Sequence, residues 1–354
     1  MNINLISIDN DLLFSFEEDD NTLLLTIEKA LNMEVNLSGL KLAKVTLNNG
    51  DLSKATLIEA HIQDSELKEV LLKSSHLTYA QISFSHFNQS DLSRSHLQNS
   101  HWTSCTLEKA DLSFADLHQC SLLHSNLRSI NLSGADLTYS QIDNCQLEGA
   151  SLIGTDLSES KITDSNLNTV DLKGSQLKQT LISKCSMREV NLTDCILDHS
   201  TFNESDLYKS LIIGSQFKQA KLQEVQMEQC NLTGSDFSGA DFNHVQLKSC
   251  LADHLSLKQT VIKNFTCTYS KLSNSNFSNA TIDSADFSHA YLQEAQFKGA
   301  TLSHVNFSKA DLRGATFNGA KMNDVNFKGA LRSIDDAPIP GWVFSQSELT
   351  LTPE

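Results

Sequence analysis

Residues that usually interrupt a fold are scarce in this sequence. Only three prolines occur among the 354 residues, at 338, 340 and 353, and all of them lie near the C-terminal end. The 14 glycines are scattered and form no cluster. Linkers between domains are typically rich in proline, glycine and polar residues. The sequence therefore shows no linker, although its length would allow two or three ordinary domains.

Long apolar runs and an excess of positive charge are absent as well. No apolar stretch approaches the length of a membrane-spanning helix. Lys and Arg total 27 against 43 Asp and Glu, a net charge of −16. This balance argues against direct, non-specific nucleic-acid binding, which needs clustered cations. The N-terminal segment MNINLISIDNDLLFSFEEDD has no basic region and no small-residue cleavage site, so we expect a cytoplasmic protein with reduced thiols and leave delivery by a dedicated secretion machine open.

Sequence motifs of common enzymes are missing too. No GxxxxGK(S/T), GxGxxG, GxSxG or HExxH motif occurs, and no CxxC pair. These motifs place nucleotides, nucleophiles or metal ions in many enzyme families. We therefore expect no catalytic residues, no cofactor and no metal site.

The sequence does contain a repeat of five residues, visible in SADFSHAYLQEAQFKGA at 284–300. A large apolar residue falls at every number ending in 2 or 7 from Leu37 to Phe327, in 57 of 59 positions. A small residue or valine stands two places before it in 56 of 60 positions. No insertion breaks this register over nearly 300 residues.

A period of five fits neither a straight helix nor a straight strand. A helix has 3.6 residues per turn and would spread these positions around its surface, whereas a strand would send them to alternate faces. The pattern fits a chain that turns a corner every five residues, so that four sides close a coil of 20. Each side then points one large and one small residue inward. Such coils stack at about 4.8 Å through backbone hydrogen bonds.

The segments SGADL (133–137), GADFN (239–243) and KADLRGATFNGA (309–320) resemble the pentapeptide-repeat family, whose pattern is A(D/N)LXX. The resemblance covers residues 35–330 and implies an all-β fold, a right-handed quadrilateral parallel β-helix of about 15 coils. We expect caps at both ends, because a solenoid otherwise exposes its core and its strand edges. The ends resemble the caps of bacterial and phage members of the family.

The expected caps are residues 1–34 and 331–354. In the N-terminal cap, residues 2–8 and 12–16 are predicted strands, and residues 21–33 a helix that begins after Asp20, Asn21 or Thr22. In the C-terminal cap, Trp342 and Val343 are expected to cover the last coil, followed by a hairpin through residues 345–347. A homodimer through one end is the functional alternative to capping.

Four residues depart from the repeat within residues 250–268. Leu255 and Phe265 are large at the small position, and Ala252 and Cys267 are small at the large position. This exchange suggests swapped packing and a local bulge or kink. The other seven cysteines occupy the small position, so all eight should point inward as small apolar residues.

Charged and apolar residues at outward positions are the candidates for binding. Nine acids lie between residues 111 and 171, against only Arg128 and Lys161: Asp111, Asp116, Asp136, Asp143, Glu148, Asp156, Glu159, Asp164 and Asp171. Asp116, Asp136 and Asp156 are one coil apart and follow His76 and His96 in the same column. A metal site on that flat ladder is disfavoured, because it offers poor tetrahedral geometry. A possible apolar patch consists of Ile196, Leu211 and Ile213.

These features favour a non-catalytic, rigid scaffold that binds another protein through its acidic surface. The resemblance implies one named target, because quinolone-resistance members of the family act as acidic DNA mimics on DNA gyrase, a type II topoisomerase. The alternative is a bacterial secretion-system effector or adaptor. Solubilising surface charge without a partner is the simplest explanation of the same acids.

Overall fold

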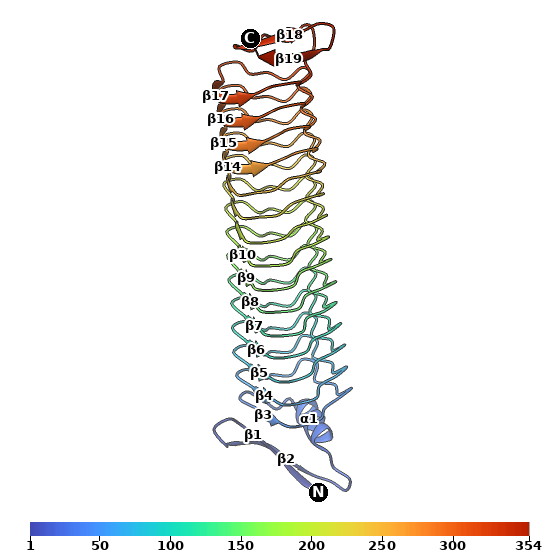
Figure 1. Cartoon of the computed structure of the whole chain (residues 1–354). Coiled ribbons are helices and arrows are strands. Elements are labelled where there is room, and N and C mark those ends of the chain that lie inside the picture. The colour runs from blue at the N-terminus through green and yellow to red at the C-terminus, as the bar shows by residue number, and fades with distance from the viewer. Residues whose placement is uncertain (354) are drawn as a thin grey trace. The chain divides into compact units, whose positions relative to one another are not determined.

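The computed structural model describes residues 1–353. By its internal contacts the chain divides into two compact units, Met1–Gln176 and Leu177–Glu354. In both units the chain winds through stacked coils of 20 residues (Figure 1).

The first unit begins with a hairpin and a helix. Strands β1 (Asn2–Ile6) and β2 (Leu12–Glu17) pair antiparallel, and helix α1 spans Leu23–Asn32. The hydroxyl of Thr22 caps the helix by accepting a hydrogen bond of 3.1 Å from the Leu25 amide. The two strands and the helix predicted from the sequence are confirmed, and Thr22 is the N-cap among the three candidates.

Each coil contributes one short strand to a parallel ladder with an offset of 20 residues. The strands of the first unit are β3 (Lys41–Ala43), β4 (His61–Gln63), β5 (Gln81–Ser83), β6 (His101–Thr103), β7 (Ser121–Leu123), β8 (Gln141–Asp143) and β9 (Lys161–Thr163). Those of the second unit are β10 (Leu181–Ser183), β11 (Thr201–Asn203), β12 (Lys221–Gln223), β13 (Asp241–Asn243), β14 (Val261–Thr266), β15 (Thr281–Asp286), β16 (Thr301–Asn306) and β17 (Lys321–Asn326). The predicted parallel β-solenoid is confirmed.

We number the four sides of a coil from the coil that spans residues 40–59. Side 1 is residues 40–44, side 2 is 45–49, side 3 is 50–54 and side 4 is 55–59, and later coils repeat these sides 20 residues on. The named strands lie on side 1, and single backbone bridges with the same offset join the other sides of successive coils. Residues 20 apart in sequence are therefore neighbours on the same side.

The corners between sides lie at residue numbers ending in 4 or 9, where the backbone is left-handed. Lys54 has φ 62°, Tyr79 62° and Phe84 50°. This conformation costs roughly 1–2 kcal/mol for residues other than glycine. Asparagine and glycine occur at some corners, but most are occupied by other residue types. The stacked coils therefore impose this conformation, because the corner residues themselves do not favour it.

The core consists of the large apolar side chains, which stack in columns. In the second unit the rings of Phe277, Phe297 and Phe317 lie 4.7 and 4.9 Å apart between centroids. Phe287, Phe307 and Phe327 form a second column with 5.2 Å between successive rings. The predicted aromatic columns are confirmed, and each adds stacking to its apolar burial.

The bulge expected within residues 250–268 is not found. Strands β13, β14 and β15 keep the 20-residue offset without a register shift. Phe265 is 2% exposed, and its ring lies 6.0 Å from that of Phe242 and 5.6 Å from that of Phe287. The exchange of large and small side chains is accommodated inside the core, because the small residues Ala252 and Cys267 occupy the same coils. The backbone therefore has no need to bend.

A second hairpin ends the chain, formed by β18 (Trp342–Ser345) and β19 (Thr350–Pro353). Trp342 packs edge-on against Phe327, with 5.6 Å between ring centroids, as expected of a cap. The expectation for Val343 is wrong, because this side chain is 50% exposed. Successive residues of a strand point to opposite faces, so only one of the two can face the last coil.

Arg332 is a second, unforeseen part of the C-terminal cap. Its side chain is buried, and its guanidinium donates hydrogen bonds to the carbonyl oxygens of Leu312 (3.1 Å), Ala315 (2.9 Å) and Ala337 (2.9 Å). Asp336 balances the charge at 3.4 Å. Burial lowers the pKa of Arg332 from its ordinary value. The side chain thus satisfies carbonyl groups that have no following coil to pair with.

Candidate functional site

Most of the predicted acids have a structural task as well as a charge. An Asp or Asn directly before the large apolar residue accepts a hydrogen bond from the amide two residues later, an Asx turn. The Oδ1 atoms of Asp116, Asp136 and Asp156 accept such bonds at 3.1, 2.9 and 2.9 Å. Asp111 and Asp171 do the same at 2.9 and 3.1 Å. This task explains the D/N of the repeat without any partner, and sequence reasoning about charge alone missed it.

The nine predicted acids lie on all four sides of the coils in the first unit. Asp143 and Asp164 lie on side 1, Glu148 on side 2, and Asp111 and Asp171 on side 3. The remaining four share side 4: Asp116, Asp136, Asp156 and Glu159. Acids that are close in sequence are thus separated around the coil, and acids 20 residues apart are brought together.

Side 4 of the first unit has an unusual charge composition. Over six successive coils, from residue 55 to residue 159, it presents five acids, which are the four above and Glu59. Among these described residues the side contains no Lys or Arg, whereas each of the other three sides of the unit has at least three. Its central acids Asp116, Asp136 and Asp156 are neighbours through backbone bridges. Like charges at strand spacing repel one another, and no fixed cation on this side offsets the repulsion.

Hydrogen bonds between neighbouring coils hold the side chains of side 4 in place. Gln98 Nε2 donates to Asp116 Oδ2 at 2.5 Å, and Thr138 Oγ1 donates to Asp136 Oδ1 at 2.7 Å. His118 Nδ1 lies 2.8 Å from Thr138 Oγ1. These contacts fix the orientation of two carboxylates before any partner arrives.

Aromatic and imidazole rings lie beside the carboxylates. Tyr79 and Tyr139 are 52% and 51% exposed. The Tyr139 hydroxyl donates to Glu159 Oε1 at 2.7 Å, and this bond raises the pKa of Tyr139. The rings of His76 and His96 stack with 4.5 Å between centroids. Exposed tyrosines are common at protein interfaces because they join an apolar ring to a polar tip.

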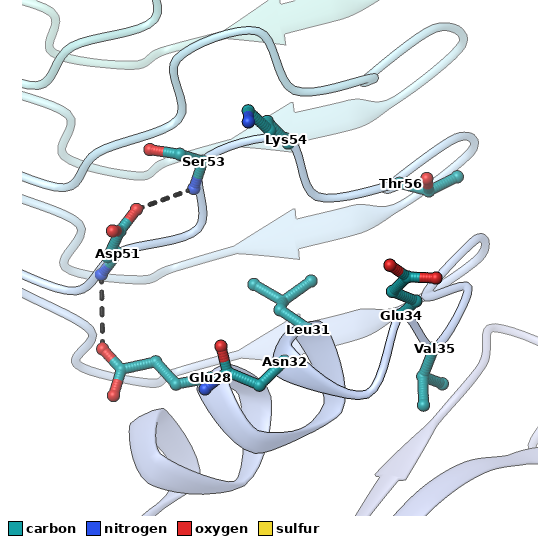
Figure 2. Close-up of a pocket in the computed structure, with 9 residues that line it drawn as sticks. All are labelled: Glu28, Leu31, Asn32, Glu34, Val35, Asp51, Ser53, Lys54 and Thr56. Carbon is teal, nitrogen blue, oxygen red and sulfur yellow. Dashed lines mark hydrogen bonds between the residues drawn. The ribbon is translucent and has the colours of Figure 1, made fainter.

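A polar cleft of about 540 Å³ lies between α1 and side 3 of the first coils. Figure 2 shows Glu28 reaching Asp51, whose amide donates to Glu28 Oε1 at 3.3 Å. The Asp51 carboxylate in turn accepts from the Ser53 amide at 2.9 Å, and its pKa is lowered by hydrogen bonds from the Ser53 side chain and backbone. Glu34 and Lys54 also line the cleft. Its polar groups join the helix to the first coils, which is a structural role.

The predicted apolar patch is divided by a corner. Leu211 and Ile213 lie on side 3 of the second unit, and Ile196 lies on side 4. Leu211 is 43% exposed, and the other two are partly buried. Asn231 separates Leu211 from Leu251, the next exposed apolar residue in its column. The structure therefore does not bring these side chains together as one surface.

All eight cysteines are buried and unpaired. Burial raises the pKa of Cys105 and of Cys145 to about 11, and raises that of Cys120 further. Such thiols are poor nucleophiles at neutral pH. Within residues 1–353, no group of three or more His, Cys, Asp or Glu side chains is arranged to hold a metal ion. In the same range no helix is long and apolar enough to cross a membrane.

Family models match most of the repeat region. The model described as pentapeptide repeats matches residues 36–73, 210–248, 266–295 and 290–329, in eight copies. The model described as a pentapeptide repeat region matches residues 95–168 and 135–212. The chain belongs to the pentapeptide-repeat family. The A(D/N)LXX pattern of this family is the one whose Asp and Asn residues form the Asx turns described above.

Several solved structures are similar to this pentapeptide-repeat chain in fold. HetL, a protein involved in heterocyst differentiation regulation in the cyanobacterium Nostoc sp. strain PCC 7120, is 23% identical with a TM-score of 0.24, over 75% of this chain and 89% of HetL. Trypsin-treated QnrB1, a plasmid-mediated fluoroquinolone resistance protein, is 17% identical with a TM-score of 0.40, over 58% of this chain and 89% of QnrB1. Rfr23 from the cyanobacterium Cyanothece 51142 is 24% identical with a TM-score of 0.14, over 43% of this chain and 95% of Rfr23. No curated protein matches the chain significantly.

Proposed function

We propose that this pentapeptide-repeat protein is a non-catalytic scaffold that binds a basic protein surface through side 4 of its first unit. The observation that carries the proposal is the absence of Lys and Arg from the described residues of that side, from residue 55 to residue 159, where five acids are present. A surface of one sign attracts a partner of the opposite sign over several ångströms and raises the association rate.

The side is also rigid, which favours binding. Its backbone is tied to the coils on either side, and the carboxylates of Asp116, Asp136 and Asp156 are held by Asx turns. A partner therefore loses little affinity to the ordering of this surface. Carboxylates repeated at strand spacing, with exposed Tyr79 and Tyr139 beside them, suit a partner that presents Lys and Arg side chains along one direction.

A DNA-binding protein is one class of basic partner. In that version of the proposal the acidic side imitates the phosphates of DNA and modulates a type II topoisomerase such as gyrase. The second version makes the chain an effector or adaptor of a bacterial secretion system. Both use the same surface, so a single set of variants tests them together.

The test replaces Asp116, Asp136 and Asp156 together by Asn. Asn keeps an oxygen that accepts the Asx hydrogen bond, so the change removes three charges and leaves the turns in place. A matched control replaces Asp91, Asp111 and Asp171 by Asn, since these residues form the same turns on side 3. Both variants change the net charge equally and differ only in the side that they alter.

Each protein is used as bait in lysate of the native host, and retained proteins are quantified by mass spectrometry. We expect a basic protein that the wild type and the side 3 control retain and that the side 4 variant loses by about tenfold or more. Topoisomerase subunits in this class would support the DNA-mimic version, and secretion-machine components the adaptor version. Equal retention by all three proteins would contradict a role for side 4.

A further inference from the structure

The last coil of the second unit is less well covered than the coil before it. Four of its inward side chains are only partly buried: Phe317, Ala320, Met322 and Val325. The residues at the same positions one coil earlier are at most 1% exposed: Phe297, Ala300, Leu302 and Val305. The apolar core therefore reaches solvent where these four side chains lie.

Strand β17 forms the edge of the sheet at this place. The C-terminal hairpin forms a separate sheet, and it joins the last coil beyond β17, through the bridge between Leu331 and Thr350 and the hydrogen bonds of Leu351. Within residues 1–353, no strand continues the ladder after β17. An unpaired strand edge is a template for pairing with another chain.

A groove of about 430 Å³ lies beside this edge. Phe317, Ala320 and Met322 line one wall, and the loop through Pro338, Ile339 and Pro340 lines the other. Proline has no backbone N–H, so the loop offers few donors that could compete for the carbonyl groups of β17. The groove thus combines a hydrogen-bonding edge with apolar walls.

The size of the end argues against a second copy of this chain as the occupant. Each side of a coil holds five residues, at most about 3.3 Å each, so the whole end measures at most about 270 Å². A stable protein interface buries about 800 Å² on each partner, and the hairpin already covers part of this end. An extended peptide needs much less area, because backbone hydrogen bonds to the edge contribute to its affinity.

We propose that the groove binds an extended segment of a partner polypeptide, which adds a strand to β17 and places a large apolar side chain over Met322. The preceding coils show what such a segment contains. Ala300 and Leu302 stack one coil before Ala320 and Met322, so the bound segment has a small residue two places before a large apolar one. This site lies in the second unit and is independent of the acidic side 4.

The probe is a labelled synthetic peptide, GATLSHVN, which copies residues 299–306 of this chain. Fluorescence anisotropy of the peptide is titrated with the full-length protein. We expect saturable binding, weakened about tenfold or more by Met322→Asp in the protein or by Asp in place of Leu302 in the peptide, because either change removes the apolar contact. The control Val343→Asp, at a 50% exposed residue of the hairpin, should leave binding unchanged.

A second variant, Ala320→Phe, fills the groove without adding charge and should block the peptide even if Met322→Asp disturbs the last coil. Absence of saturable binding, or binding that neither variant weakens, would overturn the proposal. So would a wild-type dimer in sedimentation equilibrium that Met322→Asp dissociates, since the occupant would then be a second copy. The triple Asn variant of side 4 should bind the peptide normally, which separates this proposal from the proposed function.

Discussion

Replacement of Asp136 by Asn should stabilise the protein, even though Asp136 fits the repeat pattern. Its backbone is bridged to that of Asp116 and of Asp156, so its carboxylate lies between two like charges. Its Oδ1 accepts hydrogen bonds from the amide and the hydroxyl of Thr138 at 2.9 and 2.7 Å. Asn removes the charge and retains the acceptor.

The magnitude follows from the coil spacing. Two unit charges about 5 Å apart in water repel by about 0.8 kcal/mol, so two neighbours contribute about 1.7 kcal/mol. Salt at physiological strength screens about half of this, because the Debye length is about 8 Å. The hydrogen bonds to Asn are weaker than those to a carboxylate by a few tenths of a kcal/mol. We therefore expect Asp136→Asn to raise the free energy of unfolding by about 0.5–1 kcal/mol at low salt, and by less in 1 M NaCl.

The assay is urea unfolding followed by circular dichroism at low and high salt. Asp136→Ala relieves the same repulsion but loses both hydrogen bonds, so it should be less stable than Asp136→Asn by about 1–2 kcal/mol. Asp286→Asn is a control, because its Asx turn is similar (2.9 Å) and its column neighbours Thr266 and Asn306 are uncharged. A loss of stability in Asp136→Asn as large as that in Asp286→Asn, with no salt dependence, would refute the electrostatic reasoning.

Three further changes test the core, the cap and the response to acid. Ser140 has a buried hydroxyl without a partner, so Ser140→Ala should raise the urea midpoint, whereas Ser90→Ala should cost about 1–2 kcal/mol because the Ser90 hydroxyl donates to a buried carbonyl at 2.8 Å. Arg332→Met should leave three carbonyl groups unpaired, cost about 3 kcal/mol locally and speed hydrogen exchange in residues 342–353. Burial alone would raise the pKa of Asp311, but hydrogen bonds from its neighbours outweigh this and lower it, so its stabilisation is present above about pH 4 and is lost as pH falls through the lowered value; Asp311→Asn should lose less stability between pH 7 and pH 3 than the wild type.

The candidate site could be predicted in part. The 20-residue spacing is enough to place Asp116, Asp136 and Asp156 in one column. The remaining acids of that segment share only their closeness in sequence, and the coil carries most of them to other sides. Glu59 was missed for the opposite reason, since it lies far from the segment in sequence yet on the same side. Neighbourhood on this fold is set by position within the coil, and counting in steps of 20 is the signal that would have found it.

The sequence by itself determined the solenoid, its register and the inward direction of every cysteine. Each five-residue side makes the same local choice between a large and a small inward residue, so the pattern repeats without reference to distant parts of the chain. The two ends and the departures from the repeat were decided only by the tertiary structure. The absence of a bulge near Phe265 depends on how neighbouring coils share volume, and the exposure of Val343 depends on which face of the hairpin meets the last coil. Burial of Arg332 depends on carbonyl groups that are left unpaired only because the coils end there.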